Sequence, residues 1–90
     1  MSVKRKLNHV GQRLVELREE LAVADEQLVY ISGLFDEAET ERVVSATPLA
    51  VREAREASEN LDRHRRYREG LRFEIQQLLA EQDRLLEQLV

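Results

Sequence analysis

The feature that most constrains this chain is a series of apolar residues that recurs at alternating steps of four and three positions. Such a series repeats every 3.5 residues or so, which is the spacing of a coiled-coil seam and narrower than the apolar stripe of an ordinary surface helix. The series begins near the N-terminus and predicts one long helix packed along a line against another helix. We call it the first seam; its members are Val3, Leu7, Val10, Leu14, Leu17, Leu21, Ala24, Leu28, Ile31, Phe35 and Ala38.

A second seam with the same repeat occupies the other half of the chain. Most of its members are apolar, and the residues between them are mainly Glu, Arg, Gln and Asp, as on an exposed helix surface. Its positions are Ala50, Ala54, Ala57, Leu61, His64, Arg68, Leu71, Ile75, Leu78, Gln82, Leu85 and Leu89. The two seams predict two long amphipathic helices.

The joint between these helices is expected just before Pro48. Proline at the first helical position loses no hydrogen bond, because the N–H of that position has no partner inside the helix. Thr47 is a favourable N-cap residue, and a residue before proline is pushed out of the helical conformation. We therefore expect helices over about 2–45 and 48–89.

Gly33 is the competing break point, because glycine is unfavourable inside a helix by about 1 kcal/mol relative to alanine. The first seam nevertheless keeps its register from Ile31 to Phe35, and a loop would usually shift it. We favour a continuous or mildly bent helix at Gly33 over a three-helix arrangement.

Two arms of nearly equal length joined by a tight turn fold back on one another. The predicted fold is all-α: an antiparallel two-helix coiled-coil hairpin formed by residues 1–90 as a single domain. In this arrangement Val10 lies near Leu85, and Ala38 lies near Ala54 and Ala57. A hairpin has one seam and no central core, so a second buried surface would stabilise it.

Composition excludes several classes of function. The chain has 90 residues, no cysteine, three well-separated glycines and a net charge of -4, which argues against disulfides, thiolate metal sites, glycine-rich phosphate loops and general nucleic-acid binding. No apolar run is long enough to cross a membrane, and no secretory core follows the basic start. We expect a cytoplasmic protein that is not an enzyme and holds no cofactor or metal. The excess of Arg over Lys hints at a bacterial source.

Apolar residues beside the second seam form the first candidate site. We call Leu79, Leu86 and Val90 the leucine ridge and predict that it contacts a second copy or another protein. The alternative is that these are ordinary exposed aliphatic side chains. A weaker candidate surface on the first helix comprises Val15, Val29, Leu34, Val43 and Val44.

A cluster of basic residues on the second helix forms the second candidate site. Arginines spaced three or four positions apart on a helix can present several guanidinium groups to phosphates or carboxylates. We call this set the arginine band; its members are Arg63, Arg65, Arg66, Arg68 and Arg72. The alternative is a solvated face paired locally with acidic neighbours.

Polar residues inside the second seam need partners. We expect Arg68 to pair with Asp25 or Glu26, and His64 to lie near the Tyr30 hydroxyl, as a layer that fixes the register of the hairpin. The basic N-terminal end is expected to face acidic residues of the last turns. The residues concerned are Lys4, Arg5, Lys6, His9 and Arg13 on one arm, and Glu81, Asp83 and Glu87 on the other. The acidic cluster of Asp36, Glu37, Glu39 and Glu41 suits the arginine band of a second copy.

The chain resembles small uncharacterised coiled-coil proteins of GC-rich bacteria over the stretch from Asp36 to Asn60, especially Val44-Ser45-Ala46-Thr47-Pro48-Leu49-Ala50-Val51-Arg52-Glu53, together with Ala80-Glu81-Gln82-Asp83-Arg84-Leu85-Leu86. This resemblance implies an architecture and no activity. A coiled-coil anti-sigma factor that binds a cyclic dinucleotide uses Glu, Ser, Arg, Gln and Asp along a helix. Arg72 and Gln76 fit that motif, whereas Arg65, Glu69 and Ala80 do not, so the ligand is not carried over.

These observations predict a non-enzymatic protein-interaction or regulatory module that self-associates, as a dimer or four-helix bundle, or binds another protein. The alternative is a transcription-related regulator whose arginine band binds phosphate or an acidic surface associated with RNA polymerase. Nucleic acid is the less favoured partner and a membrane is not expected.

Overall fold

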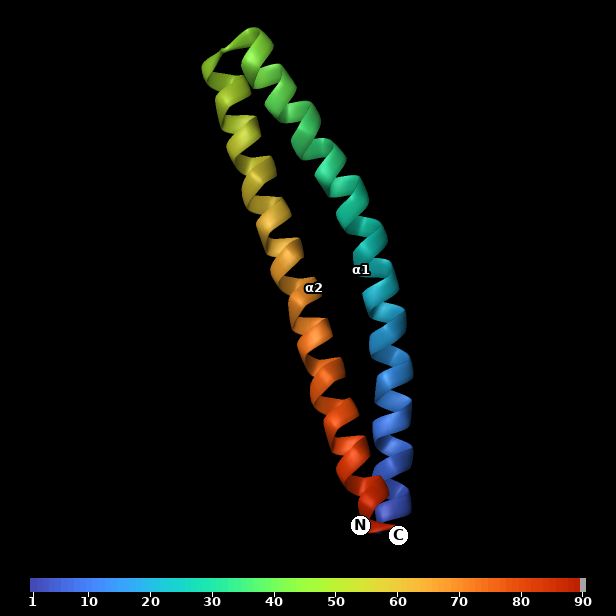
Figure 1. Ribbon diagram of the computed structural model, residues 1–90. Helices are drawn as coiled ribbons and strands as arrows, with labels where there is room; N and C mark the ends of the chain where they lie inside the picture. The colour runs from blue at the N-terminus through green and yellow to red at the C-terminus, as the bar shows by residue number, and fades with distance from the viewer. Residues whose placement is uncertain (90) are drawn as a thin grey trace. The chain divides into compact units, whose positions relative to one another are not determined.

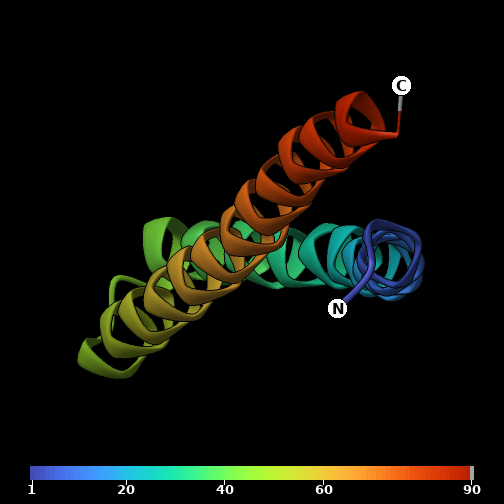
Figure 2. The same ribbon diagram turned by 90° about the horizontal axis from the view of Figure 1, so that it is seen from below.

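A computed structural model describes residues 1–89, and within them the chain forms helix α1, Val3–Ser45, and helix α2, Pro48–Gln88. Both helices are drawn as unbroken ribbon along their length (Figure 1; Figure 2). The predicted boundaries are confirmed to within one residue at each end, and the prediction of an all-α helical hairpin is confirmed. Because α1 runs through Gly33 without interruption, the three-helix alternative is wrong.

The turn between the helices is built from both kinds of helix cap. Ala46 follows α1 in the left-handed conformation, with a φ of 51°, and its N–H donates to the Arg42 carbonyl at 3.0 Å. Left-handed residues commonly end helices in this way, although glycine is the usual choice. The Thr47 hydroxyl then accepts a hydrogen bond from the Ala50 N–H at 3.1 Å, which confirms Thr47 as the N-cap of α2.

The chain divides into two compact units, and each contains a stretch of α1 and a stretch of α2. The terminal unit comprises Met1–Ala22 and the residues from Glu69 onward. Its buried core is formed by Val10, Leu14 and Leu85, against which further aliphatic side chains pack: Val3, Leu7, Ile75 and Leu78. Leu17, in the same unit, is fully buried with 0% of its surface exposed.

The turn unit, Val23–Arg68, has a smaller core. Leu28, Ile31 and Leu61 form its buried cluster, with Phe35 packed against them. The remaining buried apolar positions of this unit are alanines: Ala24, Ala50 and Ala54. The two stretches of helix run in opposite directions within this unit, as they do within the terminal unit (Figure 1).

The seams predicted from the sequence account for the buried surface of the described chain. Every member of both seams from Val3 to Leu85 is buried or partly buried, including the polar members His64, Arg68 and Gln82. The exception is Leu89, which follows the end of α2 and is 49% exposed. The prediction of a buried Leu89 is therefore wrong, because the helical repeat stops before it.

Candidate interaction surfaces

The leucine ridge lies on α2 in the terminal unit. Leu79 and Leu86 are seven residues apart, so they share one face of the helix, and they are 36% and 48% exposed. Each directly follows a seam residue, Leu78 and Leu85 respectively, and therefore borders the buried seam. Val90 lies outside the described residues. The ridge thus continues the apolar surface of the seam toward solvent on one side.

An ion pair shows which side of the seam the ridge occupies. Residues that directly precede seam positions line one flank of an antiparallel pair, and residues that directly follow line the other. Arg13 precedes Leu14 and Glu74 precedes Ile75, and their side chains meet at 3.3 Å. This pair defines a charged flank, and the leucine ridge lies on the opposite flank. We call this the apolar flank after Leu79 and Leu86, although Arg18 and Arg72 also follow seam residues there.

Gly11 belongs to the apolar flank and was missed by the sequence analysis. It directly follows Val10, which packs with Leu85 in the terminal core, just as Leu86 follows Leu85. A Cβ atom built at Gly11 would meet no atom within 4 Å. Gly11 therefore adds no side chain to this flank, and a side chain placed there would extend into open space. The sequence feature that could have indicated Gly11 is its position directly after the seam residue Val10.

The charged flank is organised around Arg13. Besides Glu74, its guanidinium lies 3.2 Å from Glu16 and 3.8 Å from Glu20. The side-chain hydrogen bonds with Glu74 and Glu16 raise the pKa of Arg13 above its ordinary value, so the side chain stays charged. The expected partners Glu81, Asp83 and Glu87 are not the ones that Arg13 contacts. Glu74 is reached instead, because it lies on the same flank and closer to the level of Arg13.

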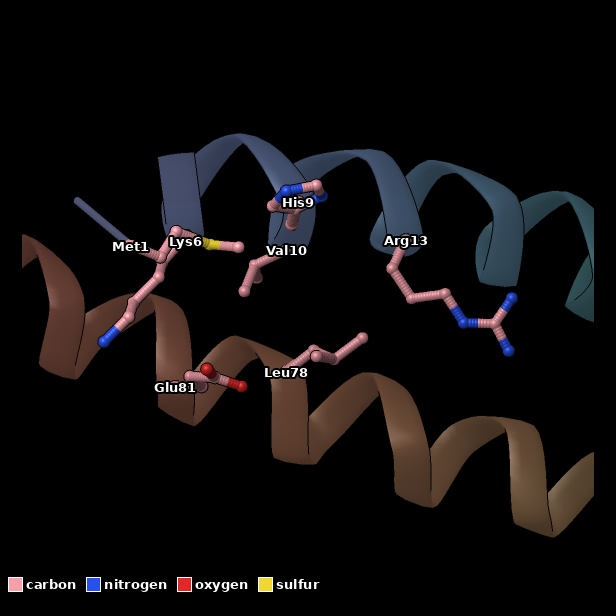
Figure 3. A pocket seen from close by; sticks show the side chains of 7 residues that line it. All are labelled: Met1, Lys6, His9, Val10, Arg13, Leu78 and Glu81. Atoms are coloured by element: carbon pink, nitrogen blue, oxygen red, sulfur yellow. The ribbon is translucent and has the colours of Figure 1, made fainter. Parts of the chain in front are cut away.

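An open hollow of about 420 Å³ lies on this flank of the terminal unit. Figure 3 shows Val10 from α1 and Leu78 from α2 pointing toward each other at its floor, with Glu81 on the α2 side. The Arg13 guanidinium points away from Met1 and Glu81, toward the ion pairs described above. The hollow is therefore apolar at its base, and the Arg13 guanidinium at its edge is already engaged with carboxylates.

The polar layer of the turn unit is formed in part as predicted. Arg68 Nη1 lies 3.7 Å from Asp25 Oδ1, which confirms the expected pair between α2 and α1. His64 does not approach Tyr30: His64 Nδ1 lies 2.9 Å from the Asn60 carbonyl of its own helix, and the Tyr30 side chain is exposed. The prediction of a His64–Tyr30 contact is wrong: the imidazole lies against the carbonyl one turn earlier on its own helix, and the Tyr30 side chain extends into solvent.

The arginine band is mostly exposed. Arg63 donates to the side-chain oxygen of Asn60 at 3.2 Å, and neither it nor Arg65 nor Arg66 forms an ion pair with any residue in 1–89. Arg72, in the terminal unit, lies 3.6 Å from Glu69. The band is thus of two kinds: Arg68 and Arg72 have carboxylate partners within their own units, whereas three members in the turn unit keep their charge toward solvent.

The acidic cluster of α1 is also only partly neutralised. Arg42 pairs with Glu39 at 2.8 Å, and the hydrogen bond with Glu39 raises the pKa of Arg42. Asp36 and Glu37 are exposed and form no ion pair within the described part of the chain. The turn unit therefore carries unneutralised carboxylates on α1 and unneutralised guanidinium groups on α2.

Two further features are absent from residues 1–89, a cluster of metal ligands and a membrane span. No three His, Asp or Glu side chains gather there as a group that could hold a metal ion. Neither helix of the described chain is long and apolar enough to span a bilayer. Comparisons with protein families, with curated proteins and with solved structures found no match to this chain.

Proposed function

We propose that this protein is a non-enzymatic interaction module that self-associates through the leucine ridge. The observation that carries this proposal is the exposure of Leu79 and Leu86 along one flank of the terminal seam, beside the open space at Gly11. A second apolar helix face laid on this flank would extend the seam into a bundle. Burial of apolar surface contributes about 25 cal/mol per Å², so two leucines per copy supply a useful share of a dimer interface.

The charged flank supports the choice of the opposite face. Arg13 and the carboxylates around it remain in contact with water, and burying them against a partner would require removing water from charged groups. The apolar flank has no such cost at Leu79, Leu86 and Gly11. Association on the ridge therefore leaves the ion pairs of Arg13 in solvent.

The test replaces both ridge leucines by glutamate and measures mass by size-exclusion chromatography with light scattering. The wild-type chain should run above the monomer mass of 10.5 kDa at high concentration, and Leu79→Glu/Leu86→Glu should return it toward that mass. The control is Gln77→Glu/Gln88→Glu, which adds the same charge at exposed positions that directly precede seam residues and therefore lie on the charged flank. An unchanged mass in the ridge variant, or monomeric wild-type protein at all concentrations, would exclude the proposal.

A second candidate function, a transcription-related regulator, is favoured by the three arginines that lack ion pairs within residues 1–89: Arg63, Arg65 and Arg66. In this case the partner carries phosphates or clustered carboxylates. Binding of a fluorescent polyphosphate chain should then weaken steeply as salt rises, and Arg65→Gln/Arg66→Gln should lower it. Association through the leucine ridge should respond little to salt, which separates the two functions.

A further inference from the structure

The outer face of α1 in the turn unit carries apolar side chains that no other part of the described chain covers. Val29 and Tyr30 are 77% and 69% exposed, although their neighbours Leu28 and Ile31 are buried in the seam. Gly33 lies four residues after Val29 and three after Tyr30, so these three positions adjoin on one face of the helix. We call them the Gly33 face.

Glycine at this position has no role within the described chain. Gly33 has no positive φ, so the backbone does not require glycine there. A Cβ atom at Gly33 would meet nothing within 4 Å, so packing inside residues 1–89 does not require it either. Glycine nevertheless weakens a helix interior relative to alanine. The remaining physical role of a missing side chain is to let a backbone from outside the chain approach closely.

Charge identifies the kind of surface that would approach. The Gly33 face is bordered by Glu26, Asp36 and Glu37, which are exposed and make no ion pair within the chain as described. The opposite charge in the same unit is on α2, where Arg63 and Arg66 form no ion pair within residues 1–89. Both sets are exposed, and no ion pair joins them within residues 1–89. A second copy of the chain supplies the missing partner for each set.

We propose that the Gly33 face of α1 binds the arginine-bearing face of α2 from a second copy. The notch at Gly33 admits the partner helix, Val29 and Tyr30 supply apolar contact, and Arg63 and Arg66 pair with the acidic border. This contact joins two unlike faces, so a bound pair keeps one free Gly33 face on one copy and one free arginine-bearing face on the other. Association should therefore grow stepwise with concentration and weaken as salt rises. It uses a surface separate from the leucine ridge and confined to the other unit.

The first test exploits opposite effects of one substitution on stability and association. In the Leu79→Glu/Leu86→Glu background, which removes the ridge contact, Gly33→Gln should raise the Tm because glutamine is a better helix former than glycine. The same change fills the notch and should weaken association by about tenfold, as read from sedimentation velocity over a concentration series. Gly11→Gln, also at an open helical position, should raise the Tm and leave association unchanged.

The second test exchanges the charges and does not depend on the ridge variant being folded. Asp36→Arg/Glu37→Arg and Arg63→Glu/Arg66→Glu should each lose the salt-sensitive association, because like charges then meet across the contact. Mixing the two variants should restore it. The proposal is overturned if Gly33→Gln associates like its parent, if the parent shows no association in the ridge-variant background, or if the mixture fails to associate. If Leu79→Glu/Leu86→Glu keeps the wild-type mass while these results hold, the proposed function fails and the contact at the Gly33 face stands.

Discussion

The two units of this hairpin share one seam repeat but differ in the side chains that fill it. In the terminal unit the seam is almost entirely large aliphatic, with Leu17 fully buried. In the turn unit alanines occupy much of the seam, and His64 and Arg68 interrupt it. Larger side chains remove more apolar surface from water, whereas alanines contribute little area. The shared periodicity therefore gives both units the same architecture, whereas the size of the side chains in the seam makes apolar burial a larger source of stability in the terminal unit.

The largest expected effect is in the terminal unit. Leu17→Ala should lower the free energy of unfolding by about 3 kcal/mol or more, because Leu17 has no exposed surface and its loss leaves a cavity. Leu28→Ala in the turn unit should cost less, about 2 kcal/mol, because Leu28 is not fully enclosed. Urea denaturation followed by circular dichroism at one fixed protein concentration measures both. Equal costs, or the reverse order, would break the comparison between the units.

The next effect concerns the cap that starts α2. Thr47→Ala should cost about 1 kcal/mol, since it removes the hydroxyl that accepts from the Ala50 N–H. Thr40→Ala is the matched control: its hydroxyl donates to the Asp36 carbonyl on an exposed helix, where alanine is the better helix former. Only the Thr47 variant should unfold at lower urea. A similar loss in both variants would contradict a capping role.

The turn should also be improvable at one position. Ala46→Gly should stabilise the protein by about 0.5–1 kcal/mol, because glycine adopts the left-handed conformation without the strain that alanine incurs. A rise in Tm by differential scanning calorimetry, with unchanged helix content, is the expected result. A lower Tm would mean that the freedom glycine adds to the unfolded chain outweighs the strain relieved.

The smallest effects should come from the ion pairs, and they sharpen the same comparison. Glu74→Gln in the terminal unit should lower the Tm less than Thr47→Ala does, because Arg13 reaches solvent and has other carboxylates nearby. High salt should remove the remaining difference in Tm between Glu74→Gln and the wild-type protein. Asp25→Asn in the turn unit should have the larger effect of the two, because Arg68 is partly buried in the seam. Thermal melts at low and high salt test the order.

Much of the fold could be predicted from the sequence because a seam of 3.5-residue period leaves few alternatives. The burial of residues such as Leu14 and Leu85 followed from their spacing, and the joint followed from the local chemistry of Thr47 and Pro48. The left-handed Ala46 did not, because alanine carries no preference for that conformation. It is specified by the need to end one helix directly before the cap of the next.

The candidate surfaces were less predictable than the fold. The spacing correctly located Leu79 and Leu86 beside the seam, but the open space at Gly11 depends on both helices at once. Long side chains were the main source of error. Across the hairpin, Arg13 contacts Glu74 and not the carboxylates expected near the end of the chain. His64 contacts the Asn60 carbonyl of its own helix and not Tyr30. Such choices depend on rotamers that a periodic pattern does not specify.

The capped turn at Thr47 also bears on how the chain folds. Contacts next to the turn close short loops, while the Arg13–Glu74 contact joins residues 61 positions apart, and loop closure costs more entropy as the loop lengthens. Pairing beside the turn therefore loses the least chain entropy, but the alanines there bury little apolar surface. Pairing at the termini loses the most chain entropy, and the leucines there bury the most apolar surface. Formation of the hairpin should therefore begin at the turn with little stabilisation and become favourable as pairing extends toward the chain ends. The cap at Thr47 should then mainly affect the folding rate, and the leucines of the terminal unit should mainly affect the unfolding rate.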